Sequence, residues 1–213
     1  NQKYVLITGA SRGIGRACAL AFARNHFHVF LNCRHSLDAL QQVEKEILDE
    51  HGSCTLLPGN AGNPDDVRKM FAIIESICPG LDVLVNNAGI SFVGLLQDMS
   101  DAQWSEILNT NLSSVFYCCR QAIPPMVSKR SGKIINISSM WGLSGASCEV
   151  AYSASKSGIN GFTKSSGEKN SHQVMPGECN CMRCHRYFYE RSAHTGRTKK
   201  PWKMKIPAGR YGT

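Results

Sequence analysis

The sequence lacks the long apolar run that a membrane protein needs. No stretch of its 213 residues approaches the roughly 20 consecutive apolar residues that cross a bilayer. The basic, apolar and small-residue regions of a secretory leader are also missing, because residues 4–8 form a short apolar run that leads straight into a glycine turn. No repeat of solenoid length is visible. These absences predict a cytoplasmic protein with no membrane partner.

Paired Cys-x-x-Cys motifs, the signature of a strong zinc site, are missing although the chain has ten cysteines. Cys179, Cys181, Cys184 and His185 have the residue types of a metal cluster, but C-x-C-x-x-C-H has no second pair. We therefore predict no bound metal. The other seven cysteines lie singly or adjacent in apolar surroundings, where reduced and buried thiols are expected, and they are Cys18, Cys33, Cys54, Cys78, Cys118, Cys119 and Cys148.

An overall basic character is missing too, despite a net charge of +8. Residues 1–164 hold 14 Lys and Arg against 13 Asp and Glu, whereas residues 165–213 hold 10 against 3. Because the excess belongs to the tail, the high pI does not indicate a nucleic-acid partner, and we predict none. The alternative, a tail that binds nucleic acid, would show as salt-dependent affinity for DNA.

The chain does have a regular alternation of short β-branched runs and helical patterns over residues 3–164. Near-continuous apolar strands separated by helices indicate a parallel sheet covered on both faces. We predict an α/β, Rossmann-type, doubly wound domain at 1–164 that carries both nucleotide binding and catalysis. The expected strands are 4–8, 27–32, 54–57, 81–85 and 133–138, and the expected helices are 13–25, 37–47, 63–77, 101–108, 111–127 and 152–164.

Residues 8–15, TGASRGIG, follow the first expected strand and open the first helix. Gly9 permits a tight turn, Gly13 lets the backbone approach a pyrophosphate at the helix N-terminus, and Gly15 allows close helix packing. The spacing G-x-x-x-G-x-G differs from the standard G-x-G-x-x-G. The placement of the glycines between strand and helix therefore predicts the nucleotide site more strongly than the glycines alone.

The second expected strand ends in LNCR and lacks the acidic residue that bonds the ribose 2′-hydroxyl at NAD-selective sites. Arg34 and Arg12 have the donors to pair with a 2′-phosphate instead. Either arginine alone could equally be a solvated surface charge. Together, and with the acid missing, they favour NADP(H) as the cofactor.

Tyr152 and Lys156 share one face at the start of a helix, which brings the ammonium near the phenol. An ordinary tyrosine has a pKa of about 10, and we expect the lysine and an oxidised nicotinamide to lower that pKa. Ser139, upstream of the tyrosine, can hydrogen-bond a substrate carbonyl. The spacing to the tyrosine favours Ser139 over Ser138, which we assign to the strand end.

In chain order, TGASRGIG, NNAG, the Asn of NTNLSSVF, the Ser of NISSM and YSASK resemble the motifs of the short-chain dehydrogenase/reductase family over residues 3–164. The resemblance implies that Tyr152 is the general acid and that Lys156 binds the nicotinamide ribose and tunes Tyr152. It further implies that Ser139 polarises the substrate carbonyl and that Asn111 holds a water in a proton relay to Lys156. The implied cofactor contacts are Gly9, Ser11, Arg12, Gly13, Ile14, Gly15, Arg34, Asn60, Asn87, Ala88 and Gly89, with Tyr152 and Lys156.

One position departs from the family pattern. Where members usually have Asp-Val against the adenine, this chain has Asn60-Ala61, so we expect weaker adenine binding. Three segments are most similar in sequence to 3-oxoacyl-[acyl-carrier-protein] reductases, namely NTNLSSVFYCCRQAIPPM, SGKIINISSMWG and the 206–212 turn IPAGRYG. That resemblance implies NADPH-dependent reduction of a thioester linked to acyl carrier protein, in fatty-acid biosynthesis, by a homotetramer.

Two alternatives stay open at this point. One is a reductase or dehydrogenase for another small carbonyl or alcohol, such as acetoacetyl-CoA. The other is a catalytically dead nucleotide-binding fragment, against which the complete set of Asn111, Ser139, Tyr152 and Lys156 argues.

Residues 165–205 differ from the rest, being polar and basic with no apolar period of 2 or 3.6. Codons chosen freely for 178–191 and read one base later give NAIACGVIDTFMN, a strand and loop of the family type. We interpret 165–205 as a frame-shifted, poorly ordered segment, followed by a family-like turn at 206–213. The resemblance also implies a further helix and strand beyond Thr213, so we expect a truncated C-terminus and leave the activity and assembly of this chain open.

Overall fold

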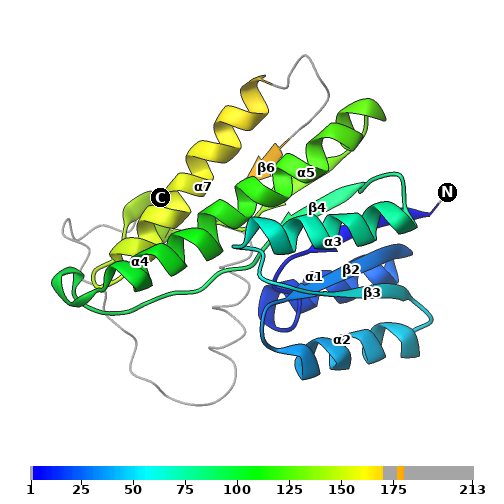
Figure 1. Ribbon diagram of the computed structural model, residues 1–213, viewed down its shortest axis with the longest axis horizontal. Coiled ribbons are helices and arrows are strands. Elements are labelled where there is room, and N and C mark those ends of the chain that lie inside the picture. The colour runs from blue at the N-terminus through cyan, green and yellow to red at the C-terminus, as the bar shows by residue number, and fades with distance from the viewer. Residues whose placement is uncertain (1, 170–176, 180–213) are drawn as a thin grey trace, which may run out of the picture.

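The computed structural model describes residues 2–169 and 177–179, whose strands form one six-stranded parallel sheet (Figure 1). The strands lie in the order β3-β2-β1-β4-β5-β6. The order reverses between β1 and β4, and such a switch point is where open α/β sheets bind their ligands. The bounds are β1 (Lys3–Ile7), β2 (Phe27–Cys33), β3 (Ser53–Pro58), β4 (Val83–Asn86), β5 (Lys133–Asn136) and β6 (Gly177–Cys179).

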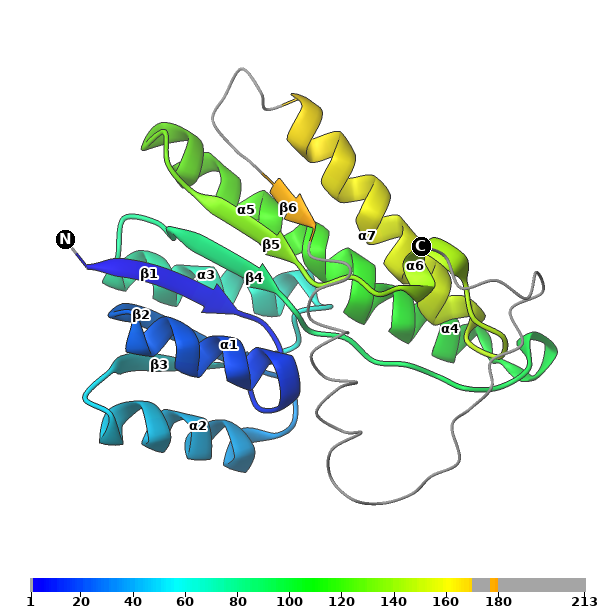
Figure 2. The same cartoon turned by 180° about the vertical axis from the view of Figure 1, so that it is seen from behind.

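Helices connect the strands and cover both faces of the sheet (Figure 2). The α4 and α5 helices are joined by a π-helical turn, and a 3₁₀ turn precedes α4. The bounds are α1 (Gly13–Arg24), α2 (Leu37–Asp49), α3 (Pro64–Ile77), η1 (Leu96–Asp98), α4 (Asp101–Leu108), η2 (Asn109–Ser113), α5 (Ser114–Ser128), α6 (Trp141–Ser144) and α7 (Val150–Lys169).

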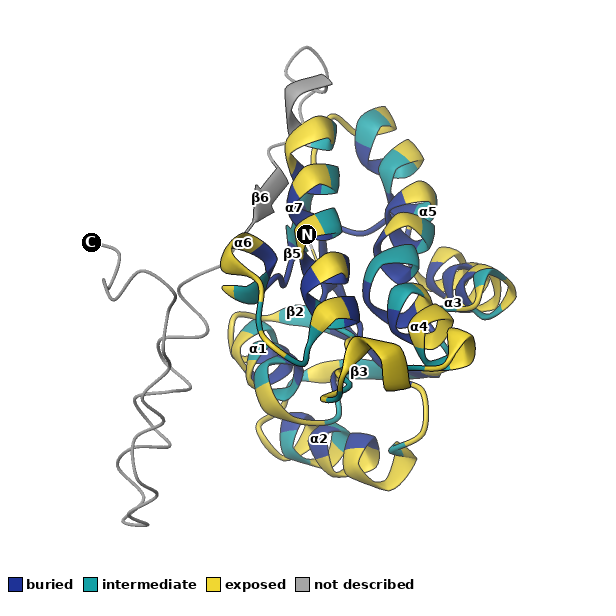
Figure 3. Cartoon of the chain, turned by 90° about the vertical axis from the view of Figure 1, so that its left-hand side faces the viewer, coloured by how far each residue is buried: buried dark blue, intermediate teal, exposed yellow. Residues whose placement is uncertain are grey.

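Alternate residues of β1, β2 and β4 enter two separate apolar cores, as the two-residue period of a strand requires. Leu6 and Phe30 pack with side chains of α3, α5 and α7, whereas Val5, Ile7 and Val29 pack with α1 and α2. Buried residues therefore lie on the inner sides of the helices and exposed residues on their outer sides (Figure 3). This double burial explains why the strands read as nearly continuous apolar runs.

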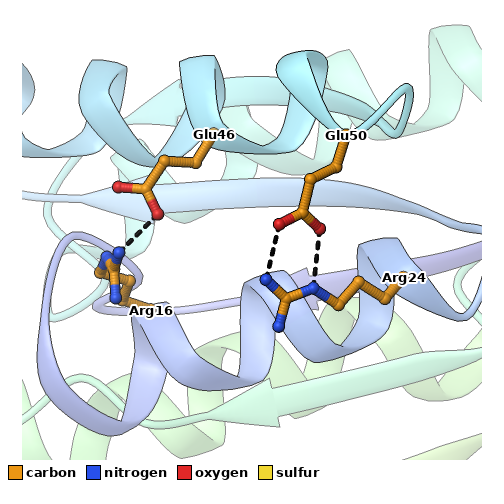
Figure 4. Close-up of polar contacts among 4 residues, drawn as sticks. All are labelled: Arg16, Arg24, Glu46 and Glu50. Carbon is orange, nitrogen blue, oxygen red and sulfur yellow. Dashed lines mark hydrogen bonds and ion pairs between the residues drawn. The ribbon is translucent and has the colours of Figure 1, made fainter.

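Two ion pairs join the neighbouring helices α1 and α2 at the surface (Figure 4). Arg16 pairs with Glu46, and Arg24 makes a bidentate pair with Glu50 at 2.6 and 2.7 Å. Such exposed ion pairs contribute little to the stability of the fold, because water already solvates both charges. The packing of these helices therefore rests on the apolar contacts beneath them.

The predicted α/β, doubly wound architecture is confirmed, and the α7 helix runs five residues beyond the expected end at Lys164. The predicted disordered segment 165–205 can be compared at 165–169 and 177–179, where the chain is helix and strand. The rest of it lies outside the described residues, as do the 206–213 turn and Cys181, Cys184 and His185. No helix in the described part is long and apolar enough to cross a membrane.

Candidate active site

A cleft of about 650 Å³ opens at the carboxyl ends of β1, β2, β4 and β5, at the switch point of the sheet. Its volume lies within the range of ligand pockets. Gly15 and Asn111 were predicted for the site but do not line the cleft. The other predicted residues do line it, and they are Gly9, Ser11, Arg12, Gly13, Ile14, Arg34, Asn60, Asn87, Ala88, Gly89, Ser139, Tyr152 and Lys156.

The loop between β1 and α1, which we call the glycine loop, has the geometry of an anion-binding site, and we call this site the anion cradle. Gly13 has a φ of +56° and open space where a Cβ would stand, so the N-terminus of α1 is accessible from the cleft. The first turn of α1 carries no acidic residue that would oppose a bound phosphate. Gly15 acts differently, because a Cβ there would lie 2.1 Å from the Gly9 carbonyl oxygen. Its absent side chain permits packing under the loop rather than contact with a ligand.

The residues after β4 are fastened to the glycine loop by Thr8, which was not singled out in the sequence. The Thr8 hydroxyl accepts hydrogen bonds from the backbone N–H groups of Asn87 and Ala88, both at 3.0 Å. The Asn87 side chain donates in return to the carbonyls of Thr8 and Gly9, both at 3.0 Å. The loop after β1 and the loop after β4 are therefore joined directly by four hydrogen bonds.

One end of the cleft carries the two predicted arginines and Asn60, and we call it the adenosine end after the predicted position of the cofactor. Among the described residues Arg12 forms no ion pair, whereas the Arg34 guanidinium donates to the Glu106 carboxylate of α4 at 2.8 Å. The Oδ1 atom of Asn60 accepts from the Gly62 N–H at 2.9 Å. With its oxygen engaged in this way, Asn60 offers the donors of its amide nitrogen, whereas the aspartate that the resemblance leads us to expect here has acceptors only.

The opposite end gathers three of the predicted catalytic residues, Ser139 from the loop after β5 and Tyr152 and Lys156 from α7. Lys156 is only 4% exposed, and its ammonium donates to the Ile137 carbonyl at 2.8 Å while standing 5.6 Å from the centre of the Tyr152 ring. Ser139 hydrogen-bonds Tyr152. Ser138 instead donates to the Lys156 carbonyl at 3.1 Å and so fastens the strand end to α7. The two serines therefore have different partners.

The lowering of the Tyr152 pKa that we expected from Lys156 together with an oxidised nicotinamide is not produced by the protein alone. Burial raises this pKa above its ordinary value, the Ser139 hydrogen bond opposes the shift, and the negative charge of Glu149 adds to it. Because desolvation dominates, the phenol stays protonated at neutral pH. A protonated tyrosine suits the part of a proton donor.

Asn111 lies in the π-helical turn between α4 and α5, fully buried behind the catalytic end. Its side chain accepts from the Ile90 N–H at 2.8 Å and donates to the Ile90 carbonyl at 2.9 Å and to Ser155 at 3.0 Å. A Cβ at Gly89 would stand 3.4 Å from Asn111 Oδ1 and 3.6 Å from Lys156 Nζ, which places both residues beside one glycine. Such π-helical turns are frequent at functional sites.

Sequence reasoning missed Glu149, which lines the catalytic end of the cleft. Its carboxylate accepts a hydrogen bond from the Ser91 hydroxyl at 2.8 Å, joining the loop after β4 to the start of α7. The available signal was its position three residues before Tyr152, about one helical turn away, which brings the two side chains to the same side.

Comparison with known proteins agrees with this fold and cleft. The short chain dehydrogenase family model matches residues 3–179. A 3-oxoacyl-[acyl-carrier-protein] reductase FabG of Staphylococcus aureus is 40% identical over 167 residues, which are 78% of this chain and 68% of that protein. The 3-oxoacyl-[acyl-carrier-protein] reductase of Synechocystis is 40% identical over 159 residues, covering 75% and 64%.

A solved structure is similar as well. The crystal structure of a metagenomic short-chain oxidoreductase in complex with NADP has a TM-score of 0.80 and 31% identity, covering 83% of this chain and 80% of that one. The chain therefore belongs to the short chain dehydrogenase family. The match of the family model passes Lys164 and includes β6.

Proposed function

We propose that this protein is an NADPH-dependent 3-oxoacyl-[acyl-carrier-protein] reductase of fatty-acid biosynthesis. The observation that carries the proposal is the single cleft that joins an anion cradle to Ser139, Tyr152 and Lys156. The relatives at 40% identity bear the name of that activity. An acyl carrier protein bearing the substrate is the partner that follows from it.

The cleft suits a dinucleotide phosphate. Gly13 leaves open space beside the N-terminus of α1, and Arg12 and Arg34 place two guanidinium groups at the adenosine end. Guanidinium donors bind phosphate oxygens in a bidentate manner. When bound, NADPH supplies the hydride that reduces the carbonyl carbon.

The protein's own residues would handle the proton. The Ser139 hydroxyl, now bonded to Tyr152, can turn to donate to the carbonyl oxygen of the substrate and hold it against the phenol. Tyr152 then gives its proton to that oxygen as the alcohol forms. The Lys156 ammonium, fixed by the Ile137 carbonyl, stabilises the phenolate that is left. Asn111 binds the backbone of Ile90 through two hydrogen bonds and so stabilises the loop beside Lys156.

The test is NADPH oxidation with three substrates that share one 3-oxo group: acetoacetyl-acyl carrier protein, acetoacetyl-CoA and a free 3-oxo ester. We expect kcat/KM to be highest for the protein-linked thioester. A higher kcat/KM for acetoacetyl-CoA would instead favour the alternative reductase. NADPH binding without turnover of any of the three would contradict the proposed catalysis.

Assembly into the family's homotetramer is part of the proposal. Trp104 of α4 and Phe116 of α5 are large apolar side chains that stay partly exposed on neighbouring helices, 36% and 44% respectively. Exposed apolar groups of this kind suit a subunit interface. Light scattering on the purified protein should give four times the chain mass, and a monomer mass would contradict this part.

A further inference from the structure

The Arg34–Glu106 ion pair lies at the adenosine end of the cleft. Both side chains line the cleft, and they come from sequence positions 72 residues apart, one after β2 and one on α4. The guanidinium-to-carboxylate distance is 2.8 Å, with 38% and 52% of the two side chains exposed. The acid that the end of β2 lacks is therefore present in space, supplied by a different element.

The backbone holds Glu106 close to this place. The C-terminal end of α4 lies directly on the loop after β3, because a Cβ at Gly62 would stand 2.9 Å from the Asn109 carbonyl oxygen. Ile107, the next residue after Glu106, is only 2% exposed and anchors the helix in the core. A capping box between Ser100 and Gln103 fixes the other end of α4.

We infer that Glu106 is a cofactor-specificity residue that weakens the preference for NADPH over NADH. This inference rests on the proposed function, since it assumes that the adenosine ribose binds beside Arg34. A 2′-phosphate must take Arg34 from Glu106 and then stay near a second negative charge, which costs affinity. The 2′-hydroxyl of NADH can instead donate a hydrogen bond to the carboxylate, as it does to the acid at NAD-selective sites.

The test is the dissociation constant of NADPH and of NADH, measured by fluorescence titration for the wild type and Glu106→Gln. We expect Glu106→Gln to bind NADPH about three- to tenfold more tightly, because one repulsive charge is removed from a half-exposed position. We expect NADH binding to be unchanged or weaker. Glu75→Gln is the matched control, since Glu75 is an exposed residue of α3 that does not line the cleft.

The outcomes separate the inference from the function on which it rests. The specificity role would be overturned if Glu106→Gln bound NADPH no more tightly than the wild type, or if it gained equally for both cofactors. In that case the proposed function still stands, provided that the wild type binds NADPH. A wild type that binds neither cofactor would overturn both. A gain for NADPH alone, absent in Glu75→Gln, supports the inference.

Discussion

The two ends of the cleft differ in how deeply their side chains are buried and in how those side chains are held. At the catalytic end Ser139 and Lys156, with Asn111 buried behind them, are 0–4% exposed, and each has hydrogen-bond partners. At the adenosine end Arg12 and Arg34 are exposed, and Arg34 is held by a surface ion pair. The chemistry therefore has a preorganised environment, whereas the charge recognition of the cofactor depends on groups that can move when a ligand arrives.

The largest effect expected from this comparison is on stability. Asn111→Ala would leave the N–H and carbonyl groups of Ile90 without their partner, and we expect the free energy of unfolding to fall by about 2–4 kcal/mol. Arg12→Gln removes an exposed charge and should change it by less than about 0.5 kcal/mol. Urea unfolding of both variants measures the difference. Equal losses would show that the two ends are not built differently.

The second effect separates the two adjacent serines of the catalytic end. Ser139→Ala removes the donor beside Tyr152, and we expect kcat to fall about 10²-fold. Ser138→Ala removes a bond to the Lys156 carbonyl and should lower the free energy of unfolding by about 1 kcal/mol with a smaller loss of kcat. Steady-state kinetics with thermal unfolding distinguishes them, and the reverse ranking of kcat would refute the assignment.

The third effect concerns the adenosine end alone. Arg12→Gln removes a guanidinium that forms no ion pair with the described part of the chain, so we expect the Kd of NADPH to rise about tenfold. Binding of NADH, which has no 2′-phosphate, should be nearly unchanged, and titration of both cofactors measures this. A similar loss for both would place Arg12 at another part of the cofactor.

The smallest effect is a shift of a pH profile. The Tyr152 pKa is raised mainly by burial, with a further rise from Glu149, so Glu149→Gln should lower it. Tyr152 must be protonated to act as the acid, and the rate of reduction therefore falls as pH rises through its pKa. In Glu149→Gln that fall should begin at lower pH than in the wild type. A fall at the same or higher pH would show that Glu149 does not act on Tyr152.

The sequence was sufficient for β1 to β5, because these strands are largely buried and therefore read as apolar runs. It missed β6, which lies in the segment 165–205 that we interpreted as poorly ordered. It predicted Tyr152, Lys156 and Ser139 together, since helical spacing and a strand end place them side by side in any such fold. The α6 helix was missed, because four residues are too few to show a helical period.

Contacts between distant segments could not be predicted in the same way. The pairing of Arg34 with Glu106 depends on how α4 packs over the loop after β3, which no local pattern encodes. The Tyr152 pKa is raised because the folded chain buries the phenol. The sequence shows the nearby lysine but not this burial, and it therefore led us to expect a lower pKa with the lysine and an oxidised nicotinamide in place. We predicted Gly15 and Asn111 as site residues, but the folded structure decides which residues line the cleft, and these two do not line it.

The most direct test of the account is Tyr152→Phe, assayed for both NADPH binding and turnover of acetoacetyl-acyl carrier protein. The phenylalanine keeps the ring and removes the proton donor at the preorganised end, while the cradle and the arginines stay in place. We predict an unchanged Kd for NADPH and a fall in kcat of about 10² to 10⁴-fold. Turnover close to that of the wild type would contradict the claim that this cleft performs reduction through Tyr152.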